Sequence, residues 1–293
     1  MIAQILAPAT TANLGPGFDV LGAAFDMDAV FEVSDGDGGF LWPDDMGALP
    51  GRNLFMEAFA AAFARRGAEV PAVSVRVKRA LPLRSGLGSS ASAIVAGLRA
   101  TELFLEPHLS PAETLAIATA LEGHPDNVAA CLYGGVTIAS GLEAPIVRRL
   151  PAPPLRAIAL YPGGGTSTPG SRAALSARVP RADAVHNVGR AALLVYALMS
   201  GEYGLLREAT RDQLHEEQRL EKCDWCPGAR AAAFRAGAVA MPVSGSGPTL
   251  VALVRPQDAD GVLRALEPYA AELDGARLWN LAFSDLGTRL QPL

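Results

Sequence analysis

The sequence predicts a two-domain protein of the α+β class. A chain of 293 residues is long for one compact core, which favours two domains. Strand and helix patterns mix through the first half, whereas the second half has the pattern of an antiparallel sheet with helices on one face. A proline-rich stretch at 151–154 separates these halves. We therefore expect one domain over residues 1–152 and another over residues 153–293.

The first half contains recognisable strand and helix signals. Valines alternate with polar residues over 73–78, which indicates a strand with one face in water. Asn53 precedes an amphipathic stretch and is placed to cap it. The expected strands are 1–6, 22–33, 73–78 and 133–139. The expected helices are 53–66, 91–105 and 111–122.

The same signals divide the second half. Apolar, β-favouring runs predict its strands, and longer periodic stretches predict its helices. The expected strands are 155–161, 239–242, 249–254 and 276–282. The expected helices are 185–199, 203–214, 228–236 and 258–269.

Bulk composition argues against several classes of function. Half of the residues are hydrophobic and 19% are charged, which is typical of a folded protein. The net charge is −5 and no basic cluster is visible, so nucleic acid is not an expected partner. Charged residues, glycine or proline break each apolar stretch before about 20 residues, so no membrane association is expected. The N-terminus also lacks the basic start of a signal peptide.

The cysteines favour a cytoplasmic protein. The chain has 3 of them, an odd and small number that fits a reducing compartment. Cys223 and Cys226 form a lone C-x-x-C without the second pair of ligands that a zinc site needs. We therefore expect them to be incidental thiols.

A glycine- and serine-rich turn precedes the helix expected at 91–105. Glycines let the backbone approach a ligand closely, and serines at a helix start offer hydroxyls beside free N–H groups. Because the helix dipole favours an anion there, the turn predicts a phosphate cradle; a plain strand-to-helix turn is the alternative. The expected cradle residues are Pro82, Leu83, Arg84, Ser85, Gly86, Leu87, Gly88, Ser89, Ser90, Ala91 and Ser92.

Two features of the cradle carry further expectations. No Gly-Lys-Ser/Thr follows, so positive charge has to come from Mg²⁺ and arginines. A side chain at Gly88 is expected to fill the space that the phosphates need, and to leave the fold intact because the turn lies at the surface.

The turn resembles the ATP loop of the GHMP kinases, whose pattern is Pro-x-x-x-Gly-Leu-Gly-Ser-Ser-Ala. Segments 7–22, 122–129 and 243–249 agree with the same family in order and spacing. The first two are similar to the homoserine kinase branch in particular. The resemblance implies a β-α-β domain with a left-handed crossover, a ferredoxin-like second domain, and an active site between them. It also implies ATP as co-substrate, Mg²⁺, and L-homoserine as the substrate, in threonine biosynthesis; a homodimer is one expected assembly.

The resemblance assigns roles to individual residues. Ser89 or Ser90 reaches the Mg²⁺, and Ser89 with Glu122 is the expected metal pair. Arg172 and Arg219 grip the substrate carboxylate, while Asp19 accepts from the ammonium or the hydroxyl. The expected substrate pocket is Asn13, Asp19, His124, Asn127, Arg172 and Arg219.

Other GHMP kinases carry an aspartate near the substrate hydroxyl, where this chain has Asn127. An amide cannot take a proton, so we expect in-line phosphoryl transfer by positioning, with Asn127 and Arg172 as the catalytic residues. Simpler interpretations remain for single residues: a turn-stabilising pair for Asn13 and Asp19, and a surface arginine for Arg219.

Two other functions compete with this hypothesis. One is a GHMP kinase for mevalonate or shikimate, which lack the ammonium group that Asp19 would bind. The other is a relative that binds ATP and a metabolite without turnover. Such a relative should have lost the glycine-serine loop or the acidic metal ligand, and both are present.

Overall fold

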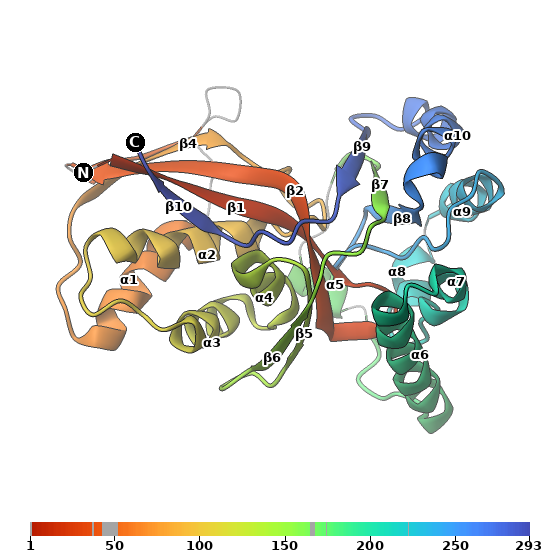
Figure 1. Cartoon of the computed structure of the whole chain (residues 1–293), viewed down its shortest axis with the longest axis horizontal. Coiled ribbons are helices and arrows are strands. Elements are labelled where there is room, and N and C mark those ends of the chain that lie inside the picture. Colours follow the sequence, from red (N-terminus) through yellow and green to blue (C-terminus); the bar gives the residue numbers. More distant parts are fainter. Residues whose placement is uncertain (1, 37, 43–51, 165–167, 174, 222) are drawn as a thin grey trace.

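The computed structural model describes all residues except 1, 37, 43–51, 165–167, 174 and 222. Within this part the chain forms two sheets, each with helices packed against it (Figure 1). The α+β class is therefore confirmed. The division between residues 152 and 153 stays a prediction.

The larger sheet is built on a long antiparallel hairpin of two strands, β1 and β2. Its strand order is β10-β1-β2-β4-β3, and β5 pairs with both β2 and β6. Its strands are β1 (Ile2–Asn13), β2 (Gly17–Asp35), β3 (Phe40–Leu41), β4 (Val73–Arg79), β5 (Val136–Ser140), β6 (Ile146–Leu150) and β10 (Arg289–Pro292). Because β10 pairs with β1, the end of the chain returns to the sheet of the first half, which the sequence analysis does not predict.

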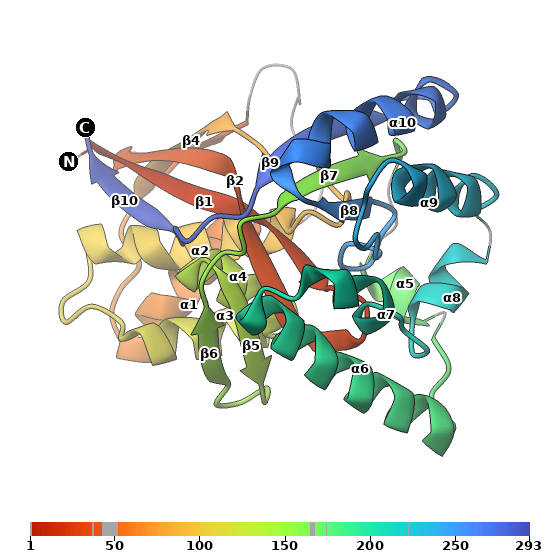
Figure 2. The same ribbon diagram turned by 45° about the vertical axis from the view of Figure 1, so that its right-hand side comes forward.

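Four helices cover one face of this sheet (Figures 1 and 2): α1 (Leu54–Arg66), α2 (Ser89–Ala100), α3 (Pro111–Glu122) and α4 (Asp126–Tyr133). The Asn53 side chain accepts a hydrogen bond from the backbone N–H of Met56 at 3.2 Å, so the expected cap is confirmed. The bounds predicted for α3 are also confirmed, and Ser110 and Glu113 form a capping box at its start. Helix α4 is not predicted from the sequence, because its 8 residues are too few to establish a helical period.

The smaller sheet has the order β8-β7-β9, and both of its strand pairs are antiparallel. Its strands are β7 (Arg156–Tyr161), β8 (Leu250–Val254) and β9 (Arg277–Ala282). Helices α9 (Cys226–Arg235) and α10 (Ala259–Ala271) pack together beside it (Figure 1). The expected antiparallel sheet is thus present. The strand expected at 239–242 is wrong, because this segment makes only one isolated bridge to β8, between Ala240 and Leu253.

The remaining helices lie beside the tip of the β1–β2 hairpin (Figure 2). They are α5 (Thr168–Ala173), α6 (Arg181–Ser200), α7 (Leu206–Ala209) and α8 (Glu216–Leu220). One helix expected over 203–214 is wrong: the chain forms a 3₁₀ turn, then α7, and then a turn at Asp212. The Asp212 carboxylate accepts from the N–H groups of Leu214, His215 and Glu216, and so starts α8 instead.

Two further findings concern the classes of protein considered above. In the described part of the chain, no helix has the length and apolar character needed to span a bilayer. Cys223 and Cys226 are joined by a disulfide, so the expectation of two incidental thiols is wrong. Cys131 is free and buried.

Candidate active site

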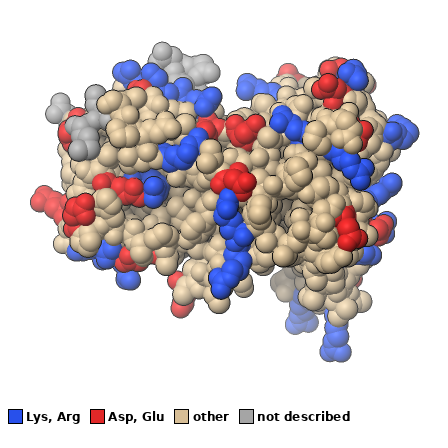
Figure 3. All heavy atoms as spheres, in the orientation of Figure 1, with Lys and Arg blue, Asp and Glu red and all other residues tan. Residues whose placement is uncertain are grey.

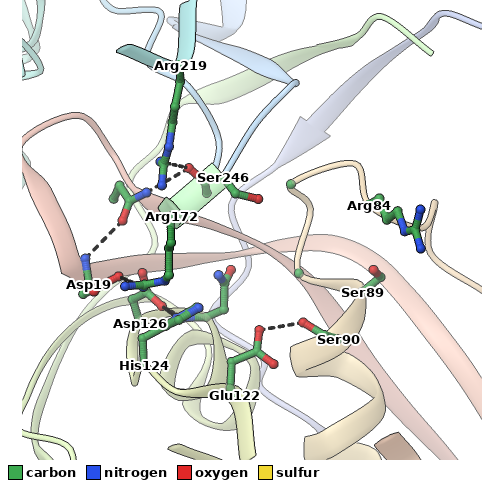
Figure 4. Close-up of a pocket in the computed structure, with 15 residues that line it drawn as sticks. Asp19, Arg84, Ser89, Ser90, Glu122, His124, Asp126, Arg172, Arg219 and Ser246 are labelled. Carbon is green, nitrogen blue, oxygen red and sulfur yellow. Dashed lines mark hydrogen bonds and ion pairs between the residues drawn. The ribbon is translucent and has the colours of Figure 1, made fainter. Parts of the chain in front are cut away.

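A cavity of about 130 Å³ lies where the hairpin, the phosphate loop and the second half of the chain meet (Figure 4). All six residues predicted for the substrate pocket line it, together with Glu122. The loop contributes five of the predicted cradle residues. These are Arg84, Gly86, Gly88, Ser89 and Ser90.

The start of α2 has the geometry expected of a phosphate cradle. Gly88 occupies the N-cap position with a φ of 72°, and no side chain caps the helix. The first N–H groups of α2 therefore lack a side-chain partner at the point where Ser89 and Ser90 line the cavity. Such a helix start attracts an anion.

Other residues of the loop shape it from within. Ser85 donates to the carbonyl of Pro82, and Ser92 donates to the carbonyl of Ser89. Leu87 is fully buried. These residues hold the loop in its conformation and do not line the cavity.

The glycines of the loop have a different role from the one expected. A Cβ added at Gly88 would lie 1.9 Å from Oγ1 of Thr10, and one at Gly86 would lie 2.4 Å from the carbonyl oxygen of Ser244. A larger residue would therefore collide with β1 or with the turn at 244–247. The expectation that the fold stays intact when Gly88 gains a side chain is wrong, whereas the expectation that such a side chain fills phosphate space stays a prediction.

Glu122 lies opposite the loop and contacts Ser90, not Ser89. The Ser90 hydroxyl donates to Oε1 of Glu122 at 2.6 Å, as Figure 4 shows. Burial raises the pKa of the Glu122 carboxyl, although the hydrogen bond from Ser90 opposes this shift. A nearby cation would restore its charged form. The expected metal pair of Ser89 and Glu122 stays a prediction, and the contact in this structure is between Ser90 and Glu122.

A tight turn brings His124 into the same cavity. Helix α3 ends at Glu122, and Gly123 reverses the chain with a φ of 90°. Nδ1 of His124 lies 2.5 Å from Oδ1 of Asp126. Burial alone would lower the pKa of His124, but the hydrogen bond to Asp126 and the surrounding carboxylates outweigh it, so this pKa is raised. The cationic form of His124 is thereby favoured.

The amide of Asn127 has a fixed orientation. The hydroxyl of Thr10, on β1, donates to Oδ1 of Asn127 at 2.7 Å. Because the amide oxygen is occupied, the amide nitrogen is the group that Asn127 can offer to a ligand, and it acts as a donor.

Asn13 ties the hairpin to the second half of the chain. Its Nδ2 donates to the carbonyl of Gly245 at 2.9 Å, and its Oδ1 accepts from the backbone N–H of Asp19 at 3.1 Å. Asn13 has a φ of 69° and Asp19 a φ of 59°, which is left-handed backbone that asparagine and aspartate tolerate better than most residues. Asn13 thus positions Asp19 as well as lining the cavity.

Two guanidinium groups approach the same aromatic ring. The Cζ atoms of Arg172 and Arg219 lie 5.3 Å and 5.5 Å from the centroid of Phe18. Arg172 also forms an ion pair with Asp19, while Arg219 donates to the carbonyl of Gly245 at 2.6 Å.

Arg219 is suited to an anionic ligand. Burial lowers its pKa, and the charge of Arg172 lowers it further. Its Nε is buried and has no hydrogen-bond partner among the residues that the structure describes. A carboxylate between Arg172 and Arg219 would relieve the repulsion and could accept from this nitrogen.

Neutral His215 can accept a hydrogen bond from Arg219 and so hold it in place. Its Nε2 lies 2.8 Å from the carbonyl oxygen of Gly15 and its Nδ1 lies 2.9 Å from Nη1 of Arg219, so we assign the proton to Nε2. The pKa of His215 is lowered, mainly by burial. Protonation at Nδ1 would turn the acceptor of Arg219 into a second donor.

This arrangement predicts a pH dependence for ligand affinity. Because a lowered histidine pKa makes protonation costly in the folded protein, the Arg219 contact is intact at neutral pH and is lost only as pH falls through the lowered pKa of His215, which lies below the ordinary histidine value. We expect KM for the carboxylate-bearing substrate to rise over that range, with a smaller change in kcat. In His215→Gln the rise in KM at low pH should become smaller, and the pH dependence that remains belongs to the other titratable groups of the cavity, such as His124 and Glu122. A profile as steep as that of the native protein would contradict the assignment.

Sequence analysis misses four residues that shape the site: Thr10, Phe18, Asp126 and Gly245. All four lie inside segments that resemble the family, so position alone could have marked them as candidates. Their roles depend on contacts with residues far along the chain, which no local pattern shows.

Comparisons with known proteins agree with this geometry. The family model described as the GHMP kinases N-terminal domain matches residues 53–135, and the GHMP kinases C-terminal model matches residues 194–271. A homoserine kinase of Desulfitobacterium hafniense is 40% identical over 269 residues, covering 90% of this chain and 91% of its own. A homoserine kinase of Thermus thermophilus is 38% identical, covering 91% of each chain.

Solved structures show the same fold. The crystal structure of a homoserine kinase from Cytophaga hutchinsonii has a TM-score of 0.88 and 28% identity, covering 99% of this chain and 97% of the other. The mevalonate kinase of L. major in complex with R-mevalonate, at 17% identity and a TM-score of 0.69, covers 95% of this chain and 94% of its own and shares the fold alone. On these similarities, the chain belongs to the homoserine kinase family within the GHMP kinases.

Proposed function

We propose that this protein transfers the γ-phosphoryl group of ATP to the side-chain hydroxyl of L-homoserine, as a step of threonine biosynthesis. One observation carries the proposal: an uncapped helix start faces a cluster of Arg172, Arg219 and Asp19 across one cavity. The helix start suits a phosphate chain, and the cluster suits an amino-acid zwitterion. The similarity to homoserine kinases supports the same pairing of substrates.

The ATP phosphates would lie against the start of α2. Arg84 supplies a cation on this loop, which has no lysine. A second cavity of about 770 Å³ adjoins the loop through Ser89 and Ser90 and has aromatic walls that include Phe40 and Trp42. A purine ring fits such walls, so we place the adenine there.

Glu122 and Ser90 fit Mg²⁺, because carboxylate and hydroxyl oxygens are hard ligands and burial disfavours an isolated charge on Glu122. When bound, the ion would neutralise phosphate charge. Asp19, His124 and Asp126 also bring ligand atoms within 4.8 Å of one another. However, Asp19 already pairs with Arg172 and Asp126 with His124, so we assign these groups to substrate binding.

On binding, homoserine would replace the ion pair between Arg172 and Asp19 with two ion pairs, one to each residue. Arg172 and Asp19 contact each other in this structure. A zwitterion placed between them would give its ammonium to Asp19 and its carboxylate to Arg172, with Nε of Arg219 as a further donor. Its hydroxyl would then point towards Asn127 and the phosphate loop.

The residues around the hydroxyl favour positioning over proton removal. Asp19 and Asp126 are each held by a cation, and the oxygen of Asn127 is held by Thr10. Asn127 can donate to the hydroxyl or to a phosphate oxygen, and a cationic His124 can offset the charge that develops in transfer. The hydroxyl proton would pass to a phosphate oxygen or to water.

Asn127→Asp tests this mechanism. The variant keeps the Thr10 contact but replaces a donor with negative charge beside the γ-phosphoryl group. We expect kcat to fall by about 10-fold or more, because the lost donor and the added repulsion both raise the barrier. In Asn127→Ala, which loses the donor without adding charge, kcat should fall less. A gain in kcat for the aspartate variant would show that proton removal limits turnover.

Transfer of label from [γ-³²P]ATP tests the function itself. The substrates to compare are homoserine, serine, threonine, mevalonate and shikimate, each with and without Mg²⁺. Homoserine should give the highest kcat/KM. A preference for mevalonate or shikimate would reject the substrate, and binding of ATP and homoserine without transfer would favour the silent relative.

A further inference from the structure

The disulfide between Cys223 and Cys226 lies just beyond the helix that carries Arg219. Cys223 follows α8 by a few residues, and Cys226 is the first residue of α9. Arg219 lies in the last turn of α8, where its guanidinium contacts His215 and the carbonyl of Gly245 in the candidate active site. A covalent bond that can open and close is therefore close in the chain to a group that is expected to bind substrate.

Helix α8 depends on contacts at its two ends. A helix of 5 residues is not stable by itself in water, because its few hydrogen bonds do not offset the cost of starting it. At its first residue, the Glu216 carboxylate accepts from Arg230 of α9 at 2.6 Å. At its other end, Leu220 and Cys223 pack against the core cluster that contains Cys226. The disulfide is the covalent part of this second anchor.

A hollow between α8 and α9 makes the disulfide important to the position of α8. The two helices line a cavity of about 780 Å³, so the sides that face each other are incompletely packed. Opening the disulfide would leave the end of α8 next to this free space. The residues of the two helices that line the cavity are Glu216, Glu217 and Leu220 from α8, and Cys226, Pro227, Arg230, Ala231 and Phe234 from α9.

The two sulfur atoms differ in their surroundings. Cys223 is partly exposed, whereas Cys226 is 2% exposed, so an incoming thiolate reaches Sγ of Cys223. Cys226 then leaves as a thiolate at the start of α9, where no side chain caps the helix and the dipole favours negative charge. A stabilised leaving group speeds thiol–disulfide exchange. In Figure 3, basic and acidic side chains are mixed over the part of the molecule that contains α9 and α10, so a reductant of either charge can approach it.

We propose that Cys223 and Cys226 form a reversible redox site, and that its disulfide form holds Arg219 in the binding position. The reductant is a dithiol. Its first thiolate forms a mixed disulfide with Cys223 and releases Cys226, which takes up a proton. Its second thiol then displaces Cys223, so that two protein thiols and one disulfide of the reductant result. The 3 cysteines of the chain fit a reducing compartment, in which the disulfides that form are usually catalytic or redox-sensing.

Reduction is expected to weaken substrate binding more than it slows the chemistry. This consequence rests on the proposed function, in which Arg219 binds the carboxylate of homoserine. Once the end of α8 is released, only a fraction of the molecules present Arg219 correctly, and KM rises by the inverse of that fraction. We expect KM for homoserine to rise by about 3- to 10-fold, with a smaller change in kcat. KM for 3-aminopropan-1-ol should not change, because it has no carboxylate.

Hydrogen exchange measured by mass spectrometry tests the anchor without any substrate. The folded protein is compared as the disulfide and after treatment with dithiothreitol, and alkylation of the new thiols verifies each state. The amides of residues 216–220 should exchange at least about 10-fold faster in the reduced form, whereas those of α2 should not change. Cys131→Ser, which keeps the disulfide, should respond as the native protein does. Cys223→Ser should resemble the reduced form with or without dithiothreitol.

Equal exchange of residues 216–220 in the two forms would overturn the proposal, and so would a disulfide that dithiothreitol does not open in the folded protein. Steady-state kinetics on the same samples test the link to Arg219. An unchanged KM for homoserine, or an equal rise for homoserine and 3-aminopropan-1-ol, would overturn that link. If neither form transfers phosphate to homoserine, the proposed function fails, and the exchange measurement alone decides the redox site.

Discussion

Arg172→Ala is expected to lower kcat/KM for homoserine by roughly one to two orders of magnitude. The reason is the loss of charged hydrogen bonds to the substrate carboxylate, in a pocket where Phe18 and Asp19 hold the guanidinium in place. Each such bond contributes about 1.5–3 kcal/mol. Arg172→Lys should recover only part of the activity, because an ammonium cannot make the bidentate contact.

A second substrate separates lost binding from general damage. 3-Aminopropan-1-ol has the ammonium and hydroxyl of homoserine but no carboxylate, so it should be a very poor substrate of the native enzyme. Its kcat/KM should fall far less than that of homoserine in Arg172→Ala, since the group that Arg172 binds is absent. The freed Asp19 carboxylate would also be fully available to its ammonium.

The control for this series is Arg178→Ala. Arg178 is exposed and lies six residues along the chain from Arg172. Its removal should therefore leave kcat/KM unchanged for both substrates. Steady-state kinetics with both substrates, together with circular dichroism of each variant, complete the measurement. Equal proportional losses for both substrates in Arg172→Ala would reject the carboxylate contact.

Much of the site could be predicted because its residues lie in short motifs with characteristic chemistry. The glycine-serine loop, the segment after α3 and the first hairpin do meet at one cavity. The motifs could not show which of two adjacent residues contacts a distant side chain. Ser89 and Ser90 are adjacent in sequence, but their side chains leave α2 in different directions, and only Ser90 contacts Glu122.

Residues that act through partners far along the chain could not be predicted from the sequence. Phe18 has no polar atom to mark it, and its role appears only when residues 172 and 219 fold over its ring. The expectation that the fold tolerates a side chain at Gly88 was wrong for a similar reason. A glycine motif shows that space is needed but not what fills it, and here Thr10 on β1 does.

The fold was predicted best where an element has clear signals at its ends. Helix α3 has Ser110 and Pro111 at its start and Gly123 at its end, and its bounds were predicted correctly. Strand β10 has four residues and pairs with β1 at the other end of the chain, so neither its length nor its neighbours signal it. The helix expected through residue 212 failed because an aspartate carboxylate competed for the backbone N–H groups.

Glu122→Gln is expected to reduce kcat by roughly 100- to 1,000-fold. The amide keeps the shape of the side chain and can still accept from Ser90, but it cannot supply the charge that a dication requires. Half-saturation by Mg²⁺ should shift to higher concentration, and this shift is measured by titrating turnover at saturating ATP and homoserine. A loss of stability alone would lower activity at every Mg²⁺ concentration without moving the midpoint.

The neighbouring serines supply a matched pair for the same experiment. Ser90→Ala removes the hydroxyl that contacts Glu122 and should raise the Mg²⁺ midpoint by about 10-fold or more, whereas Ser89→Ala should raise it much less. Both changes remove one oxygen from the first turn of α2, so helix propensity and phosphate contacts are altered alike. The difference between them therefore reports the contact with Glu122. If Ser89→Ala has the larger effect, Ser89 is the metal ligand, as expected from the sequence, and the proposed pairing of Ser90 with Glu122 at the metal is wrong.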